Sequence, residues 1–197
     1  MFQTAPGVFV PFPEKIHEQF QVYEEQLLRA NVSFEKLRPL ILDFCHRIAE
    51  PLFFVLQLPL TLQEEKQYSS DTVLHQAVYY MDGQTRQQIE AILNSYGKIL
   101  LADGLCQFAI ASHATHEELF VRKYKLIDIY SNSPRRFAPL LQQYGLTETD
   151  RLLTVWDTFS QETPGRCSLI SIEGQDVYGI AEQLKEKGMY RAKIIED

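Results

Sequence analysis

The stretch 105–131, LCQFAIASHATHEELFVRKYKLIDIYS, decides the fold. Its first part alternates across two faces that are both mostly apolar, a pattern typical of a central strand covered on two sides. A polar turn, HATHEE, occupies 113–118, and β-branched and aromatic residues resume after it. Arg122, Lys123 and Lys125 interrupt this second apolar run. We therefore expect a hairpin whose second strand projects past the sheet and exposes these cations.

A capped helix is predicted directly after this hairpin, over 133–144. Ser133 suits the N-cap, Pro134 the first helical position and Gly145 a left-handed stop. The apolar residues between them recur at helical spacing and form one stripe, which consists of Phe137, Leu140, Leu141 and Tyr144.

The first fifty residues are predicted to form an N-terminal arm and a helical hairpin. Residues 1–13 contain three prolines and read as an extended arm that packs on the body. Apolar residues keep a helical period over 14–30, and a second helical stripe follows Ser33, with Pro39 either kinking that helix or marking its first turn.

The remainder, 51–197, reads as two strands and then a helix, three times over. The first pair of strands (51–60 and 73–81) flanks a polar loop at 61–71, and a helix with capping-box spacing at Thr85 and Gln88 follows. After the central hairpin and its helix come the last predicted elements: strands in the first half of 151–160 and at 167–174, a helix capped by Asp176, and a closing strand over 189–197. This order favours an α+β fold with a largely antiparallel sheet and ββα-type units, packed with 1–50 into one compact unit.

Composition limits the classes of function. With 45% hydrophobic residues in 197, the chain has enough apolar side chains for a packed core, and its net charge of −7 argues against general nucleic-acid binding. Three widely spaced cysteines, Cys45, Cys106 and Cys167, indicate buried thiols in a reducing compartment. Since we find neither a secretory signal nor a membrane-length apolar run, we expect a soluble cytoplasmic protein.

The hairpin turn carries candidate metal ligands. His113, His116 and Glu117 offer imidazole and carboxylate groups, which zinc and similar ions prefer. Their spacing does not match an HExxH site, and a solvated polar turn explains the same residues. We expect no cofactor.

A second candidate site surrounds Trp156, the single tryptophan of the chain. Trp156 and Asp157 begin a loop, 156–163, whose aromatic, carboxylate and hydroxyl groups suit ligand binding. The alternative is a tryptophan packed in the core at a strand end, with Asp157 accepting hydrogen bonds from turn amides.

Arg135 and Arg136 lie in the first turn of the predicted 133–144 helix, where cations oppose the helix dipole. A negative partner would resolve this conflict. We favour a carboxylate of the chain itself over a bound phosphate.

No motif in the chain identifies a reaction. The interpretation that follows is a non-catalytic protein, whether regulatory, immunity-like or accessory, that binds a macromolecule. A protein partner is expected, of basic character because the chain is acidic, and a homodimer is a further expectation. The expected anchors are Trp156, Asp157, Tyr130, Arg135 and Arg136. The alternative is a hydrolase or transferase, with or without a metal, whose site lies near the 113–118 turn or the 156–163 loop.

Overall fold

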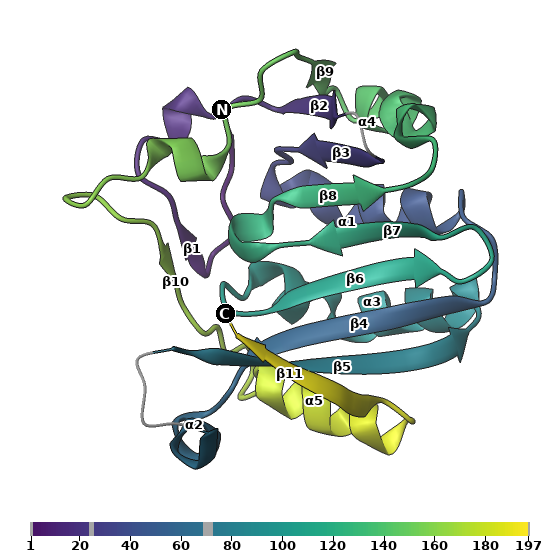
Figure 1. Cartoon of the computed structure of the whole chain (residues 1–197), viewed down its shortest axis with the longest axis vertical. Helices are drawn as coiled ribbons and strands as arrows, with labels where there is room; N and C mark the ends of the chain where they lie inside the picture. Colours follow the sequence, from purple (N-terminus) through teal and green to yellow (C-terminus); the bar gives the residue numbers. More distant parts are fainter. Residues whose placement is uncertain (1, 24–25, 69–72, 197) are drawn as a thin grey trace.

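The fold is built on one large sheet, seen in a computed structural model that describes residues 2–23, 26–68 and 73–196 (Figure 1). Within this part of the chain the sheet has nine strands, and all neighbouring pairs are antiparallel except β2 with β9. In spatial order the strands are β11 (Tyr190–Glu196), β5 (His75–Gln84), β4 (Leu52–Pro59), β6 (Gln107–Ser112), β7 (Glu117–Val121), β8 (Ile127–Tyr130), β3 (Leu27–Ala30), β2 (Gln19–Tyr23) and β9 (Thr147–Glu148). The predicted α+β class and its largely antiparallel sheet are confirmed.

Helices cover one face of this sheet. Behind the strands in Figure 1 lie α1 (Phe34–Cys45), α3 (Arg86–Ala102) and α5 (Val177–Glu186), and α4 (Ala138–Gln143) packs beside α1. A further short helix, α2 (Leu62–Tyr68), lies at the end of the sheet where β4 stops. The main hydrophobic core is the layer between sheet and helices. Its large, fully buried side chains include Phe44, Phe54, Leu56, Phe108 and Phe137.

The other face of the sheet has a second, smaller apolar cluster. It is centred on Val55, Val78, Ala109 and Phe120, which are buried although no helix of the described residues crosses this face. Ala109 lies directly between Val55 and Phe120 in the register, so larger neighbours shield its small side chain. All six residues of β6 are therefore buried, as the apolar pattern of 105–112 predicted, but the shielding on this face comes from the sheet itself.

The strongest local signals formed as predicted. The Thr85 side chain accepts from the Gln88 backbone, and the Gln88 side chain accepts in return, so α3 begins with the predicted capping box. Asp176 accepts from the Gly179 backbone and caps α5. Gly145 has a φ of 80° just after α4. Ser133 is an exception, because it makes no side-chain capping bond and the helix begins as a 3-10 turn, η3 (Pro134–Phe137).

The predicted N-terminal helical hairpin is wrong. A short 3-10 turn, η1 (Pro13–Lys15), is followed by the β-hairpin of β2 and β3, and the first α-helix begins only at Phe34. Phe20 and Leu28 point into the core while Gln21 and Arg29 point to the other face, which is the alternation of a strand. The apolar residues of 14–30 fit both periods, and pairing of β3 with β8 selects the strand.

The prediction of one long strand that projects past the sheet is wrong, because a turn divides it into β7 and β8. Residues 122–126 leave the sheet in a 3-10 turn, η2 (Lys123–Lys125), so one predicted strand is two paired ones.

The third predicted ββα unit is absent. Instead of a strand, 151–158 contains a 3-10 turn, η4 (Val155–Thr158). In the segment predicted as strand 167–174, pairing is limited to Cys167 at the end of β10 (Arg166–Cys167) and to an isolated bridge between Ile172 and Gln175. The Leu152 backbone N–H donates to the Gln21 side chain. A side chain, and not a paired strand, therefore satisfies this backbone group. Within the predicted polar loop 61–71, residues 62–68 form α2, and 69–71 lie outside the described residues.

The N-terminal arm is held against the body by two glycines. Gly7 donates to the Ala102 carbonyl at 2.7 Å, and Gly104 donates to the Ser168 carbonyl at 3.0 Å. A Cβ built on Gly104 would lie 2.1 Å from the Gly7 carbonyl oxygen. The close approach of the two backbones therefore requires glycine at 104. The arm ends in β1 (Val8–Phe9), which pairs with β10.

We expect Gly104→Ala to lower the free energy of unfolding by about 1–3 kcal/mol, because the added methyl group overlaps backbone atoms. Gly97→Ala is the matched control. Its Cβ would make ordinary contacts with Leu93 at 3.8 Å and with Arg38 of α1 at 3.9 Å, so we expect a gain of about 0.5–1 kcal/mol. Urea unfolding measures both changes, and equal stabilities for the two variants would contradict the role of this contact.

Candidate functional site

Two adjoining cavities lie at the end of the sheet where β4 stops and β5 and β6 begin. The larger, of about 800 Å³, is mostly apolar and is enclosed by α2, the turn η2 and parts of the 156–169 segment. We call it the apolar groove. It is defined by Leu60, Leu62, Leu74, Leu105, Trp156 and Leu169.

The large apolar side chains at the rim of the apolar groove are unusually exposed to solvent. Leu62 is 83% exposed, Leu74 63% and Trp156 48%. Single exposed apolar residues are ordinary, whereas a cluster around a cavity indicates a surface that another molecule covers.

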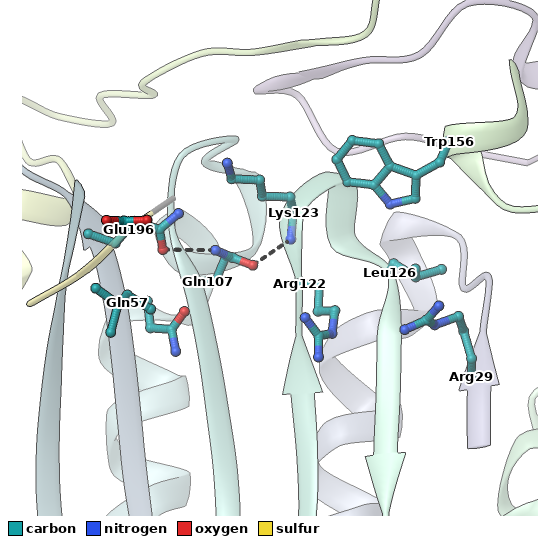
Figure 2. A pocket seen from close by; sticks show the side chains of 10 residues that line it. Arg29, Gln57, Gln107, Arg122, Lys123, Leu126, Trp156 and Glu196 are labelled. Atoms are coloured by element: carbon teal, nitrogen blue, oxygen red, sulfur yellow. Dashed lines mark hydrogen bonds between the residues drawn. The ribbon is translucent and has the colours of Figure 1, made fainter. Parts of the chain in front are cut away.

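The smaller cavity, of about 380 Å³, lies on the open face of the sheet (Figure 2). We call it the polar cavity. It is defined by Arg29, Gln57, Gln107, Arg122, Lys123 and Trp156. Lys123 and Trp156 line both cavities, so the two cavities adjoin at these side chains. Gln107 anchors this wall: its amide donates to Gln76 at 3.0 Å and its carbonyl accepts from the Lys123 backbone at 3.0 Å.

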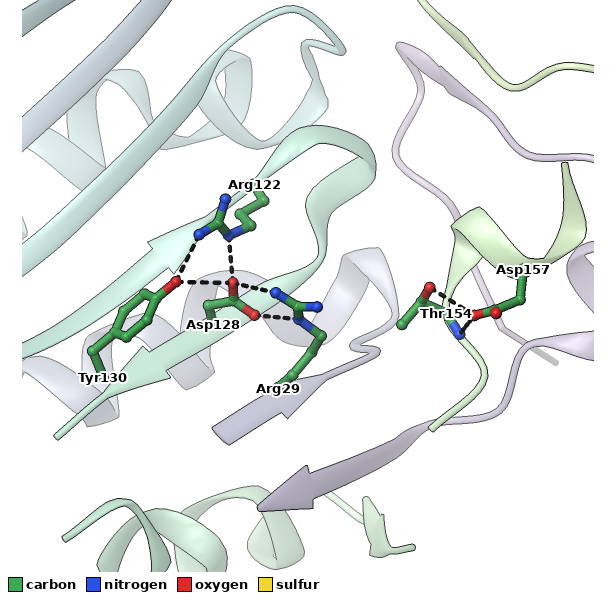
Figure 3. Close-up of polar contacts among 6 residues, drawn as sticks. All are labelled: Arg29, Arg122, Asp128, Tyr130, Thr154 and Asp157. Carbon is green, nitrogen blue, oxygen red and sulfur yellow. Dashed lines mark hydrogen bonds and ion pairs between the residues drawn. The ribbon is translucent and has the colours of Figure 1, made fainter. Parts of the chain in front are cut away.

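A fully buried carboxylate organises the arginines of the polar cavity (Figure 3). Asp128 accepts from Arg29 Nε at 2.6 Å and from Arg29 Nη2 at 2.8 Å, and it also bonds to Arg122 Nε. The Tyr130 hydroxyl accepts from Arg122 Nη2 at 2.6 Å. The hydrogen bond with Asp128 raises the pKa of Arg29. Both guanidinium groups are thus charged and held in fixed orientations.

The side chains of the turn η2 lie between the two cavities, and two residues of this turn have a strained backbone conformation. Tyr124 and Lys125 both have positive φ, at 58° and 61°, and such non-glycine residues cost on the order of 1–3 kcal/mol each. The buried Lys125 ammonium offsets this cost by donating to the carbonyls of Leu100 at 3.1 Å and Cys106 at 3.0 Å. Lys125 therefore fixes the turn, and Lys123 and Tyr124 line the apolar groove.

The Trp156 ring packs against two other aromatic rings. Its ring meets Tyr124 edge-on at 4.8 Å and Phe159 at 5.3 Å. Asp157 accepts from the Thr154 backbone at 2.7 Å and from its hydroxyl at 2.9 Å. The alternative in which Asp157 satisfies turn amides is confirmed, but the tryptophan is at the surface and not packed in the core.

Arg135 and Arg136 lie away from both cavities and bind carboxylates of the chain. Arg135 pairs with Glu148 at 3.0 Å, and Arg136 pairs with the buried Glu117 at 3.1 Å. The prediction that an internal carboxylate compensates these cations is confirmed.

The predicted metal ligands do not come together. His113 stacks on Phe53 at 4.3 Å and lies 3.4 Å from an Asp82 oxygen, while Glu117 binds Arg136. In the part of the chain that the structure describes, no group of three or more histidine, cysteine, aspartate or glutamate side chains is placed to hold a metal, and His113, His116 and Glu117 form no such group.

Sequence reasoning missed most residues of the two cavities. The helical period of 14–30 predicts a helix at Arg29, and the sequence pattern places Leu62 in a loop and Leu74 in a strand. Two signals in the sequence indicate this region: the single tryptophan, Trp156, and the cations Arg122 and Lys123, whose position in the apolar run predicts exposure. The sequence gives no signal for the glutamines, because neutral amides in strands resemble ordinary polar positions.

The thiols of the chain are poor nucleophiles. Burial raises the pKa of Cys45 to about 12 and that of Cys106 to about 11. Cys167, which lines the apolar groove, also has a raised pKa because of burial, partly offset by hydrogen bonds from Tyr124. Since the thiolate is the reactive form, the structure gives none of these cysteines the environment of a catalytic thiol.

Comparison with known proteins found no match for this chain among family models, curated protein sequences or solved structures. Among residues 2–23, 26–68 and 73–196, no helix is both long and apolar enough to cross a membrane.

We expect Glu118→Gln to stabilise the protein at pH 7 and to have no effect at pH 3. Burial raises the pKa of Glu118, the nearby Asp128 also raises it, and Arg122 partly offsets these effects. The folded state therefore holds the proton more tightly, and the stability that this adds is lost as pH rises through the folded pKa. Urea unfolding from pH 3 to pH 7 measures the difference, with Glu162→Gln, at an exposed position, as the control. A variant that is less stable than wild type at pH 7 would contradict the assignment.

We expect Cys167 to react slowly with iodoacetamide at pH 7.5 and faster as pH rises above 9, since burial suppresses its thiolate. Cys45 and Cys106 are buried and should react only after unfolding. Mass spectrometry of timed samples measures each site. Fast labelling of Cys167 at neutral pH would instead indicate an activated thiol.

Proposed function

We propose that this protein acts by binding a protein partner and not by catalysis, with the apolar groove as the docking surface. The observation that carries the proposal is the groove itself, a mostly apolar cavity of about 800 Å³ whose rim of large apolar side chains stands in solvent. Covering such a rim removes apolar surface from water, which is the main favourable contribution to association.

The exposed rim favours a protein over a small ligand. A molecule confined to the cavity would leave Leu62 and Leu74 in water, because each projects more than half of its surface outward. Small-molecule sites enclose most of their ligand, whereas protein interfaces extend from a buried centre over a surrounding rim. A polypeptide segment lying in the groove covers both the cavity and its rim.

Trp156 is the central anchor in this proposal. It lies where the two cavities meet, and aromatic side chains at the centre of an interface contribute most to affinity. Tyr130 and Asp157 serve to hold Arg122 and Thr154 in place. Arg135 and Arg136, both paired with carboxylates, are outside the proposed surface.

The groups in and near the groove that catalysis would require are already engaged. Glu65 accepts from the His75 backbone and lies 2.9 Å from His75 Nδ1. Burial raises the pKa of Tyr124 to about 12, with contributions from Cys167. These contacts stabilise the neutral tyrosine and fix the carboxylate, and so they support binding over the alternative of a hydrolase or transferase.

We expect Trp156→Ala and Leu62→Ser each to abolish recovery of a partner in a tagged pulldown from the native host. Leu62 is 83% exposed, so its substitution tests the surface without disturbing the fold. Loss of a central anchor costs about 2 kcal/mol or more, which is roughly a 30-fold weaker Kd.

Leu153→Ala is the matched control, since Leu153 is exposed and apolar but outside the groove. Recovery of the same partner with all three variants would refute the proposed surface. Recovery of a second copy of this chain would identify the partner as the homodimer that we expected from the sequence.

A further inference from the structure

One wall of the apolar groove is formed by the short helix α2. Leu62 and Glu65 of this helix belong to the lining of the groove, and so does Leu74, which directly precedes β5. Figure 1 shows α2 at the end of the sheet, outside the layer of α1, α3 and α5. The shape of the groove therefore depends on whether this one helix stays in place.

The helix α2 buries none of its residues. Five of its seven residues are exposed, and the other two, Glu64 and Glu65, are half-buried. By contrast, α5 contributes four buried side chains to the main core, namely Val177, Ile180, Ala181 and Leu184. A helix as short as α2 is marginal in water by itself, and apolar burial is what usually holds such a helix in a protein. The helix α2 lacks this contribution.

The strongest contacts between α2 and the sheet are made to His75, the first residue of β5. Glu65 accepts from the His75 backbone N–H at 2.6 Å and lies 2.9 Å from His75 Nδ1. The centroid of the Tyr68 ring lies 5.8 Å from that of the His75 ring. The hydrogen bond with His75 lowers the pKa of Glu65, so this carboxylate is charged at neutral pH. We call Glu65, Tyr68 and His75 the latch.

A second attachment of α2 is weaker than the latch. Arg191 of β11 donates to Glu64 at 3.2 Å, but both side chains are partly exposed. Exposed ion pairs contribute little to stability, since water and salt screen them. Glu64 also accepts from the backbone N–H and the hydroxyl of Thr61, and these bonds cap α2 without attaching it to the sheet.

We infer that α2 is a detachable wall of the apolar groove. It undocks from His75 and unwinds while the sheet and the other helices stay folded, and the groove is complete only while α2 is docked. Detachment of a segment that buries no side chain exposes little apolar surface, so its free energy is far below that of global unfolding. The consequence for docking rests on the function proposed above: a partner that binds the complete groove holds α2 in place, and undocking of α2 weakens the partner's binding.

Hydrogen exchange of the whole protein, followed by mass spectrometry, measures the undocking without any partner. The amides of 65–68 are protected only while α2 is formed, so we expect them to exchange about a hundredfold or more faster than the protected amides of α5. His75→Ala removes both side-chain contacts of the latch and should speed exchange in α2 about tenfold, with no change in α5. Glu65→Gln, on the helix itself, should act in the same direction without disturbing β5.

His46→Ala is the matched control for His75→Ala. His46 also lies 2.9 Å from a glutamate, Glu90, but this pair joins the end of α1 to α3. We expect exchange in α2 to be unchanged in this variant.

A neutral apolar dye, N-phenyl-1-naphthylamine, tests the link between α2 and the groove. Trp156 is the single tryptophan and lines the groove, so energy transfer from Trp156 to the dye reports binding there. At a dye concentration about ten times its Kd, exchange in α2 should slow about tenfold, because a ligand that binds only the docked form stabilises it by mass action. In His75→Ala the Kd of the dye should rise in proportion as the docked fraction measured by exchange falls.

Exchange in α2 that is as slow as in α5, or that neither His75→Ala nor Glu65→Gln changes, would overturn the inference and keep the docking groove. Dye that binds beside Trp156 without slowing exchange in α2 would do the same, because the groove would then be complete without the helix. If no dye binding depends on Trp156 and the pulldown recovers no partner that depends on it, the proposed function fails, and the role of α2 in docking fails with it.

Discussion

Burial of one face of the sheet against α1, α3 and α5 is the constraint on which the rest of the structure depends. The strands contribute side chains such as Phe54, Phe108 and Ile129 to this layer, and the helices contribute Phe44 and Leu100. Apolar burial of this extent is the main favourable contribution to folding, and it fixes the register of each strand because a one-residue slip would reverse its faces. The opposite face is then left to sheet residues alone, which is why charged and amide side chains gather there.

The polar cavity is a consequence of that arrangement. Asp128 alternates with Ile127 and Ile129, so the strand that buries two isoleucines in the core presents a carboxylate to the open face. A buried carboxylate is tolerated only when it is paired, and Arg29 from the neighbouring strand β3 and Arg122 from the start of the η2 turn supply the pairing. Beyond the end of the sheet, the strained turn η2 and the aromatic support of Trp156 form the boundary between this cavity and the apolar groove.

Sequence-based predictions are reliable where a side chain satisfies a backbone N–H group only a few residues away. The capping box at Thr85 and the cap at Asp176 formed as expected, because each joins groups only three residues apart. Predictions are less reliable where the hydrogen-bonding partners of a segment lie far away in the sequence. The hairpin of β2 and β3 was read as a helix, and residues 151–155 were read as a strand although Gln21 binds their backbone.

The sequence by itself determined the α+β class, the central strands and the capped helices, since periodicity and capping act within a few residues of the chain. It also drew attention to Trp156 and to the cations near Lys123. Only the tertiary structure decided that these residues lie together, because the groove and the cavity combine residues from 29 to 196. The pairing of Asp128 with Arg29, 99 positions apart, depends on strand order, and strand order is set by packing of the whole sheet.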